Sequence, residues 1–422
     1  MKNVPEIRFK GFEEEWKTYI LSSIGNFRSN GVDKKIYNDE QIVNLLNYMD
    51  VYNYRKITSK NCIDLMKVSA TKKQIKDCNI IKGDIFFTPS SETPDEIGYV
   101  MSIEETLPNT CYSYHLMRFR PFDKILYLSF ADYCFSSNYL RGQMKFKAKG
   151  VQRFILSKLD FESLEALLPS YEEQEIITCL FKAIDNVIND CKKKIASLKQ
   201  LKSACLISMF PQQGETVPRI RFKGFDGEWK KKQIGEIGYT YSGLTGKTKS
   251  DFGIGDCLYI TFLNVLNNAI INSSILEKVN VCIDEKQNKV CKGDILFNTS
   301  SETPEEVGMC AAVDEELIDV YLNSFCFGLR ITDKEIDSLF FAYLMRSDIG
   351  RKIMKFLAQG ATRYNLSKNN FYKTKLLLPE TKAEQHQIAS YFRNLDIQIS
   401  EQEKRLEKLK QIKAACLDKM FV

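Results

Sequence analysis

A glycine-containing segment at 241–248 carries the residue types that bind phosphate groups. It reads Tyr-Ser-Gly-Leu-Thr-Gly-Lys-Thr, the end of a P-loop pattern, but Tyr241 stands where that motif requires its first glycine. The motif also requires a helix directly after the loop, whose first N–H groups face the phosphates. Residues 249–255 read as a loop instead, so the pattern disfavours nucleotide hydrolysis. The polar residues suit DNA phosphates equally well, and the candidates are Ser242, Thr245, Lys247 and Thr248.

Other catalytic patterns are also disfavoured. The turn Pro94-Asp95-Glu96 returns as Pro304-Glu305-Glu306, which would exchange the metal-binding aspartate of a nuclease for glutamate, so solvated turn residues are the simpler interpretation. No Asn-Pro-Pro-Tyr or Asp-Pro-Pro-Tyr sequence occurs for methyl transfer to a base. The two histidines, His115 and His386, do not recur at matching positions, which disfavours a catalytic triad and a Cys/His zinc site. We therefore expect no catalytic, cofactor-binding or metal-binding residues in this chain.

Two polar motifs occur in both halves of the chain. Residues 88–92, Thr-Pro-Ser-Ser-Glu, match 298–302 after a predicted strand, and residues 149–154 match 359–364 with the shared pattern Gly-x-x-Arg-aromatic. Hydroxyl groups and an arginine beside a glycine suit contacts to DNA phosphates or base edges. A turn that bonds its own backbone and an arginine paired with a nearby carboxylate are the alternatives. The candidates are Thr88, Ser90, Ser91, Lys149, Arg153, Ser300, Ser301, Arg363 and Tyr364.

The elements that position these motifs are duplicated. Residues 4–12 return at 217–225, an offset of 213, and Lys82-Gly83-Asp84-Ile85 returns at 292–295, an offset of 210. This period is too long for a solenoid repeat of ~20–50 residues. Short β-type runs such as 84–88 and 294–298, together with helical stretches such as 338–356, predict an α+β domain in each half.

Each half closes with a long predicted helix. The capping-box patterns Ser170-x-x-Glu173 and Thr381-x-x-Glu384 mark the two helix starts. Apolar residues then recur at alternating steps of four and three, the seam of a coiled coil, with a lysine at the eighth position of each stripe. The first stripe is Ile177, Phe181, Ile184, Ile188, Cys191, Ile195, Leu198, Lys202, Cys205 and Met209. The second is Ile388, Phe392, Leu395, Ile399, Gln402, Leu406, Leu409, Lys413, Cys416 and Met420.

The stripes predict two rods of roughly 55 Å that pack on each other. A pseudo-twofold relation between the copies requires them to run antiparallel, with a globular domain at each end. The alternative is that each helix packs only on its own domain. The predicted parts are a first domain at 1–169, a first helix at 170–210, a linker at 211–216, a second domain at 217–379 and a second helix at 380–422.

The halves align poorly over 26–80 and 239–290, and well around them. Similar scaffolds with dissimilar insertions suit two readers of different sequences, although neutral drift in loops would look the same. Lys34 and Lys35 in the first insertion are further candidates for DNA contact.

Composition sets broad limits on the class of protein. The chain has 422 residues, 60 basic against 54 acidic, and 13 cysteines without a C-x-x-C pair. Its formal charge of +6 permits a nucleic-acid partner without requiring one. The start of the sequence does not resemble a signal peptide, and no apolar run approaches a membrane span. We expect a cytoplasmic protein with reduced thiols.

The combination and order of these features resemble the specificity subunit of type I restriction–modification enzymes over essentially the whole length. The segments that carry the resemblance are 169–188 with its twin 379–399, and the openers that run from Ile7 to Trp16 and from Ile220 to Trp229.

The resemblance implies two target-recognition domains, near 15–169 and 228–379, that each read half of a bipartite DNA site. It also implies two methyltransferase subunits, which bind S-adenosylmethionine, and an ATP- and Mg-dependent restriction subunit as partners. This chain would supply recognition and no catalysis. A scaffold whose two heads bind proteins is the first alternative, and a stand-alone enzyme is the second.

Overall fold

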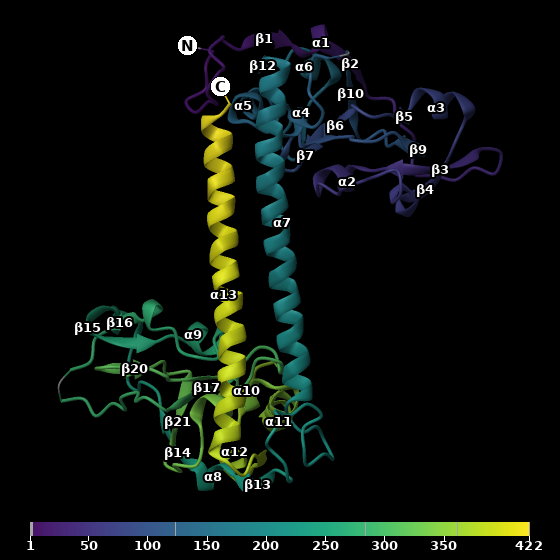
Figure 1. Cartoon of the computed structure of the whole chain (residues 1–422). Helices are drawn as coiled ribbons and strands as arrows, with labels where there is room; N and C mark the ends of the chain where they lie inside the picture. The colour runs from purple at the N-terminus through teal and green to yellow at the C-terminus, as the bar shows by residue number, and fades with distance from the viewer. Residues whose placement is uncertain (1–2, 123, 283, 361, 422) are drawn as a thin grey trace. The chain divides into compact units, whose positions relative to one another are not determined.

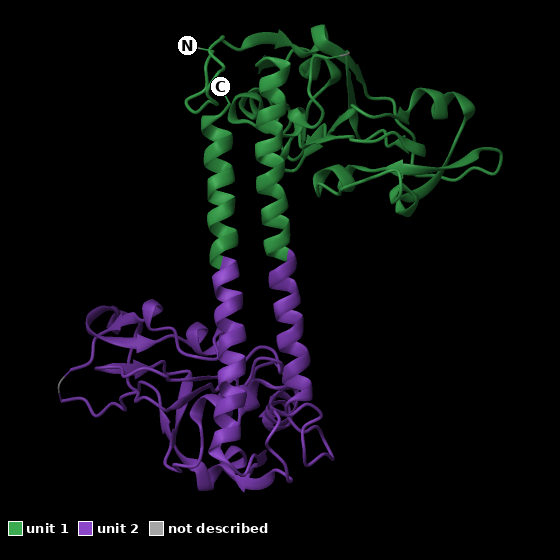
Figure 2. Cartoon of the chain, viewed as in Figure 1, with its two compact units in different colours: residues 1–192, 404–422 green, residues 193–403 purple. Residues whose placement is uncertain are grey.

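The computed structural model describes residues 3–122, 124–282, 284–360 and 362–421. The chain divides into two compact units, residues 1–192 with 404–422, and residues 193–403 (Figure 2). The units therefore do not follow the linear order of the duplication. Each contains one globular domain, the first part of one long helix and the last part of the other (Figure 1).

The domain of the first unit mixes short strands and short helices. Its strands are β1 (Lys17–Ile20), β2 (Gly25–Arg28), β3 (Gln41–Leu46), β4 (Met66–Ala70), β5 (Asn79–Ile80), β6 (Ile85–Phe87), β7 (Ser90–Ser91), β8 (Val100–Ser102), β9 (Leu107–Tyr112), β10 (Met117–Pro121), β11 (Phe154–Ile155) and β12 (Glu165–Leu168). Its helices are α1 (Leu21–Ile24), α2 (Tyr48–Tyr52), η1 (Cys62–Asp64), α3 (Lys72–Asp77), η2 (Pro94–Glu96), α4 (Phe130–Cys134), α5 (Asn138–Lys147) and α6 (Lys158–Glu162).

The domain of the second unit has a similar order of elements. Its strands are β13 (Lys230–Gln233), β14 (Gly238–Ser242), β15 (Phe252–Ile260), β16 (Glu277–Val279), β17 (Ile295–Asn298), β18 (Ser300–Ser301), β19 (Cys310–Ala312), β20 (Val320–Leu322), β21 (Cys326–Ile331), β22 (Ala358–Gln359), β23 (Tyr364–Leu366) and β24 (Lys375–Leu378). Its helices are α8 (Ile234–Ile237), η3 (Lys249–Asp251), α9 (Phe262–Asn267), η4 (Ser273–Ile275), α10 (Ser338–Arg346), α11 (Asp348–Leu357) and α12 (Lys368–Lys373).

A four-stranded antiparallel sheet is common to both domains, in the order β2-β10-β6-β8 in one and β14-β21-β17-β19 in the other. A second sheet lies beside each, β4-β3-β9-β5 and β16-β15-β20, and each contains one parallel pair. The predicted strands near 84–88 and 294–298 are confirmed as β6 and β17.

The central strands are apolar because they are covered on both faces. In β6, Ile85 and Phe87 face one hydrophobic core while Phe86 faces another, as alternation along a strand requires. In β17, Phe297 and Leu296 divide between two cores in the same way.

The two long helices are α7 (Tyr171–Ser208) and α13 (Lys382–Lys419), each of 38 residues. The described residues of both predicted stripes are buried or half-buried, so the stripes do mark the covered faces. The regular interlocking of a coiled coil stays a prediction.

The predicted hydroxyl caps of the two long helices are present, but the predicted return bonds from the glutamates are not observed. The amide of Glu173 donates to Ser170 Oγ at 3.2 Å, and the amide of Glu384 donates to Thr381 Oγ1 at 3.4 Å. The glutamate side chains do not close the capping box, because arginines of the two openers take them. Arg8 donates two bonds of 2.8 Å to Glu173.

The lysine shared by the two stripes has a partner in each unit. In the first unit, Lys413 of α13 pairs with Asp185 of α7 at 2.5 Å. In the second unit, Lys202 of α7 pairs with Asp396 of α13, also at 2.5 Å. The two contacts join equivalent positions of the repeat, but α13 provides the lysine in the first unit and α7 provides it in the second. Within each unit, the end of one long helix therefore lies beside the earlier part of the other.

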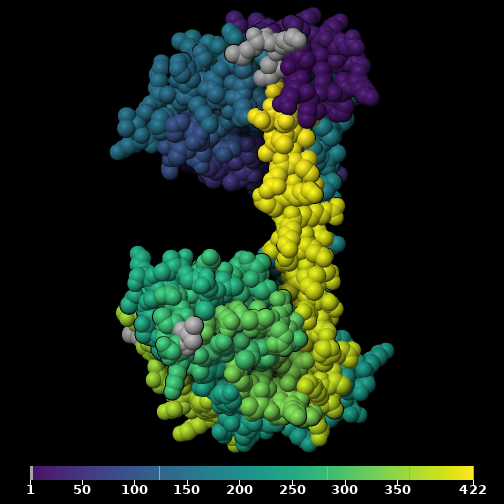
Figure 3. All heavy atoms as spheres, turned by 90° about the vertical axis from the view of Figure 1, so that its left-hand side faces the viewer, coloured from purple at the N-terminus to yellow at the C-terminus, as the bar shows by residue number. Residues whose placement is uncertain are grey.

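The end of each long helix also completes a core. Phe421 packs edge-on against Trp16 with ring centroids 6.0 Å apart, and Phe210 packs against Trp229 at 6.2 Å. The amide of Ile7 bonds to the carbonyl of Lys419 in the first unit, where the N-terminal segment lies beside the end of α13 (Figure 3).

Two expectations for secondary structure are corrected. The predicted helix at 338–356 is two helices, because buried Ser347 has an extended backbone and caps α11 through Gly350. The segment 249–255, predicted as a loop, forms η3 and the start of β15. Among the described residues, no helix is both long and apolar enough to cross a membrane.

Candidate nucleic-acid interface

The two recurring polar motifs meet in the first unit. Strand β7, which carries Ser90, pairs antiparallel with β11, which follows Arg153. The guanidinium of Arg153 donates to Ser90 Oγ at 3.0 Å, and its side chain remains exposed. A half-buried hydroxyl and an exposed cation thus share one small ribbon, which suits a phosphate oxygen.

The second unit builds the same ribbon from its own copy. Strand β18 pairs with β23, and Arg363 Nε donates to Ser300 Oγ at 3.2 Å. The Arg363 guanidinium also lies over the ring of Phe325, 5.6 Å from its centroid. Among the described residues, no ion pair joins either arginine to a carboxylate, in contrast to the alternative expected from sequence.

The glycine of the Gly-x-x-Arg motif is required by the fold of its own loop. Gly150 has φ +141°, and a Cβ there would lie 1.9 Å from the carbonyl oxygen of Arg153. At Gly360 the corresponding distance is 2.1 Å. This glycine is therefore explained by its close approach to the carbonyl of the motif arginine, and approach of a phosphate to the loop stays a prediction.

The two stretches that seemed unrelated in sequence occupy equivalent places. A Cβ on Gly31 would lie 2.3 Å from the backbone of Ser113, and one on Gly243 would lie 2.1 Å from the backbone of Asn323. The amides of Val32 and Leu244 then bond to Tyr112 and Leu322 respectively. The loops around Lys34 and Lys247 are therefore counterparts, despite their different sequences.

Two of the candidate cations in the first unit, Lys34 and Arg153, act on the same histidine. Burial lowers the pKa of His115, and the charges of Lys34 and Arg153 lower it further. His115 occupies the position that Phe325 holds in the second unit, where Phe325 meets Arg363. The ring that lies beside the motif arginine in the second unit thus corresponds to His115 in the first, and the two rings differ in chemistry.

Several predicted contact residues already have internal partners. Thr88 is fully buried and its hydroxyl accepts the amide of Tyr99, so it cannot reach a ligand while this hairpin is folded. Ser91 donates to the carbonyl of Thr93, and Ser301 donates to Glu306 at 2.9 Å. The hydroxyls of Ser91 and Ser301 therefore stabilise the ribbons through internal hydrogen bonds.

The Lys247 loop is tied down in the second unit. The Lys247 side chain is only 4% exposed and pairs with Glu285 at 2.6 Å. Thr248 caps η3, and Thr245 bonds to Gln287. Ser242, Thr245 and Thr248 remain exposed, as do Lys34, Lys35 and Lys149 of the first unit, while Tyr364 is half-buried. The contacts of these exposed residues with DNA stay predictions.

A tyrosine cluster beside the first ribbon was missed by sequence reasoning. Tyr48 donates to the carbonyl of Ser90 at 2.7 Å and stacks on Tyr52, whose ring contacts Tyr99. Burial raises the pKa of Tyr48 above its ordinary value, which extends to higher pH the range in which its hydroxyl can donate this bond. The repeated tyrosines between 48 and 54 were the available signal.

The acidic turns at 94–96 and 304–306 form ion pairs with neighbouring helices. Asp95 pairs with Lys145 at 2.5 Å, and Glu305 pairs with Lys355 at 2.8 Å, so each turn is held by the helix α5 or α11. Among the described residues, no group of three or more acidic, histidine or cysteine side chains is placed to hold a metal ion.

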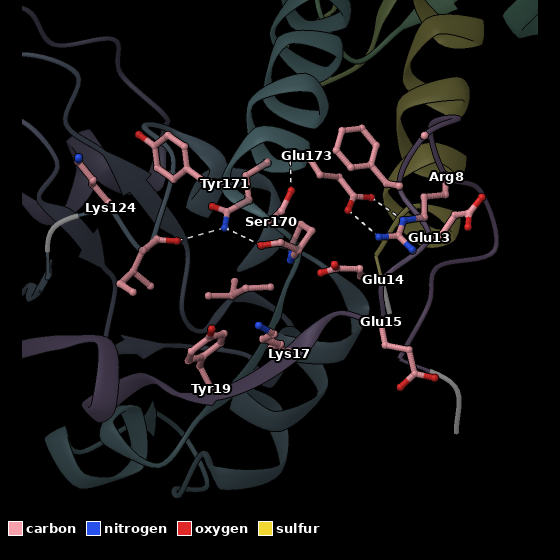
Figure 4. Close-up of a pocket in the computed structure, with 16 residues that line it drawn as sticks. Arg8, Glu13, Glu14, Glu15, Lys17, Tyr19, Lys124, Ser170, Tyr171 and Glu173 are labelled. Carbon is pink, nitrogen blue, oxygen red and sulfur yellow. Dashed lines mark hydrogen bonds and ion pairs between the residues drawn. The ribbon is translucent and has the colours of Figure 1, made fainter.

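A pocket of about 400 Å³ lies at the start of α7 (Figure 4). The fork between Arg8 and Glu173 forms one wall, and Tyr171 and Lys124 lie at the other side. Gln174 Nε2 donates to the carbonyls of Ile125 and Pro169. The Arg8–Glu173 pair joins the opener to the start of α7, and Gln174 joins that start to the preceding domain, which indicates a structural role for the pocket.

Comparisons with known proteins agree with this architecture. The family described as type I restriction modification DNA specificity domain matches residues 13–200 and again 226–411. The S subunit of a type I restriction–modification system from M. genitalium is 16% identical, with a TM-score of 0.58 over 99% of each chain. A structure titled for complex assembly and conformational transition of the type I system is 15% identical, with a TM-score of 0.54 over 97% of this chain and 98% of that one. Curated protein sequences gave no match.

The two family matches cover most of the chain, once in each half. The chain therefore belongs to the type I restriction–modification DNA specificity family. It is a DNA sequence-recognition subunit with tandem recognition domains, as the sequence predicted.

Proposed function

We propose that each unit reads one half of a split DNA site and that the chemistry resides on partner subunits. The observation that carries this proposal is the repeated ribbon, in which Arg153 meets Ser90 and Arg363 meets Ser300. One phosphate-binding ribbon on each domain would position the two domains on DNA in the same way. Phosphate contacts set the position and orientation of a protein on the duplex without reading the bases.

Base reading would then come from the parts that differ. The tyrosine cluster contacts the first ribbon through Tyr48, whereas Phe325 contacts Arg363 of the second. The equivalent loops around Lys34 and Lys247 also differ in sequence. Different side chains on equivalent scaffolds would present different hydrogen-bonding patterns to the major groove, where base pairs can be told apart.

Partners would complete the enzyme. Two methyltransferase subunits would bring S-adenosylmethionine, and a restriction subunit would bring ATP and Mg²⁺. We place no catalytic residue on this chain.

The test is the pattern of methylated adenines in cells that carry this chain with its methyltransferase. We expect a split motif, and replacing residues 26–80 by the corresponding segment of a relative should change one half-site only. Changes in both half-sites, or a continuous motif, would contradict the assignment of one unit to each half.

A protein-binding scaffold would behave differently in solution. We expect the full chain, alone or with its methyltransferase, to bind duplex DNA with an affinity that falls steeply as salt rises, because basic residues displace counterions from phosphates. Absence of such binding in both preparations would favour the scaffold.

A further inference from the structure

Two phenylalanines at twin positions are almost fully exposed. Phe146 is 92% exposed and Phe356 is 88% exposed, and they are separated by the same offset of 210 residues that relates Lys82 to Lys292. Exposed aromatic rings of this size are poorly accommodated by water. Their occurrence in both repeats at one structural position indicates a shared contact.

The helices that carry these rings are firmly held. In α5, Met144 is fully buried and Arg141 donates to the carbonyls of Ile97 and Asp95. In α11, Met354 is fully buried and Arg351 donates to the carbonyls of Glu305 and Val307. Each phenylalanine comes two residues after the buried methionine, which turns it to the opposite side of the helix.

The surroundings of both rings are basic. Residues 138–153 contain five arginines and lysines and no acidic residue, and residues 347–363 contain four basic residues and the single acid Asp348. In the fold, Lys352 pairs with Asp348, Lys145 pairs with Asp95 and Lys355 pairs with Glu305. Among the described residues of these segments, Lys147, Lys149 and Arg153 after Phe146, and Arg363 after Phe356, form no ion pair. Cations that follow an apolar ring along the chain match a polyanion with apolar rings of its own, which is the chemistry of a nucleic acid.

The rings also lie close to the ribbon along the chain. Lys149, whose backbone pairs with Ile155 next to Arg153, follows Phe146 by three residues. Three residues span at most about 11 Å. In the second unit, β22 begins two residues after Phe356 and pairs with β23 beside Arg363. A duplex held by either arginine would therefore come within reach of the neighbouring ring.

We propose that Phe146 and Phe356 are DNA-contacting residues, one for each half-site, whose rings press against exposed sugar and base faces beside the phosphate that the motif arginine holds. This inference rests on the proposed function and adds a nonpolar contact to it. Apolar side chains inserted at base steps are a known means of gripping and bending DNA.

The experiment measures binding of the full chain, with its methyltransferase, to a duplex that contains its split site across a range of salt. We expect Phe146→Ala and Phe356→Ala each to weaken binding by about 5- to 100-fold, as expected for loss of a stacked ring. The slope of log affinity against log salt should stay unchanged, because the ring neutralises no phosphate. Arg153→Ala should instead reduce the slope by about one.

Ile318→Ala is the matched control, since Ile318 is 85% exposed but lies among Asp314, Glu315, Glu316 and Asp319. It should bind DNA as the unmodified chain does. Because all three side chains are exposed, unfolding midpoints should stay equal.

The outcomes separate this inference from the proposed function. If the unmodified chain binds its split site and both phenylalanine variants bind equally well, the inference is wrong and the proposed function stands. If the variants instead lose association with the methyltransferase while DNA affinity per complex is kept, the rings are a protein contact. If the unmodified preparation does not bind the duplex, the proposed function itself fails.

Discussion

At the scale of single residues, arginines of the two openers have the least expected role. Sequence repetition showed that Arg8 returns as Arg221 and that Glu173 returns as Glu384, but gave no sign that they meet. In the structure each pair forms a fork across more than 160 residues, and the glutamates are 1% and 2% exposed. A local capping pattern could not reveal this, because a distant cation competes for the same carboxylate.

Arg8→Ala should lower the free energy of unfolding of the first unit by about 3 kcal/mol, because it leaves a buried carboxylate without its cation. Trp16 is buried in that unit and Trp229 in the other, and the chain has only these two tryptophans. Denaturant unfolding in a Trp229→Phe background, followed by Trp16 fluorescence, measures the first unit alone.

Lys158→Ala serves as the control for this measurement, because it lies in the same unit. Its pair with Glu162 spans one turn of α6 and the lysine is 49% exposed, so the loss should stay below about 1 kcal/mol. Equal losses for the two variants would show that burial of Glu173 contributes little.

The Glu285 carboxylate should make the second unit sensitive to acid. Bonds from Lys247, Gln287 and the amide of Cys282 lower the pKa of Glu285 from 4.5 to about 2. A carboxylate whose pKa is lower in the folded state than in the unfolded state stabilises the fold at pH values above the unfolded-state pKa. This stabilisation is lost as the pH falls from about 4.5 toward 2. Glu285→Gln should therefore lower the urea midpoint at pH 7, and the difference should shrink at pH 4 and further at pH 3.

The exposed Glu316 provides the comparison for that series. Glu316→Gln should leave the midpoint close to that of the unmodified chain at each pH. A Glu285→Gln difference that stays constant from pH 7 to pH 3 would contradict the assigned stabilisation.

At the scale of elements, the sequence was most informative where a pattern was long or repeated. The two 38-residue helices begin and end within about three residues of the predicted bounds. The helix break at Ser347 was missed because serine does not exclude a helix, and only burial of its hydroxyl as a cap reveals the break. The equivalence of the loops after Gly31 and Gly243 was missed because it depends on a close approach of two backbones. That approach requires glycine at one position of each loop and places no constraint on the residue types at the others.

The shared lysine of the stripes should contribute to pairing of the helices within each unit. Lys413 contacts both Asp185 and the ring of Tyr133, whose hydroxyl donates to Asp185 at 3.1 Å. A double-mutant cycle with Lys413→Met and Asp185→Asn should give a coupling of about 1 kcal/mol, since both side chains are about 30% exposed. The exposed pair Lys410 and Glu407, 3.7 Å apart, should give a coupling near zero by the same cycle.

At the scale of the whole molecule, the linear repeat and the compact units do not coincide. Phe210 ends the first repeat but packs in the second unit, and Phe421 ends the second repeat but packs in the first. Alignment of the halves cannot show this exchange, because both arrangements give the same sequence pattern. Each unit therefore depends on residues that are distant in sequence.

Both long helices pass from one unit to the other, so their length should govern the spacer between half-sites. Duplicating residues 188–194 in α7 together with 405–411 in α13 adds one heptad to each helix, about 10.5 Å. At a rise of about 3.4 Å for each base pair, the accepted spacer should lengthen by about three base pairs while both half-sites stay the same. The methylated motif of cells that carry the variant measures this directly.

Adding a heptad to α7 alone is the informative contrast. One helix would then be longer than its partner between the same two units, which should displace Phe210 from the core around Trp229 or interrupt the pairing of Lys202 with Asp396. We expect this variant to lose specific methylation and to unfold at lower denaturant. If it methylates the original motif as well as the unmodified chain does, the two helices do not act together as the spacer.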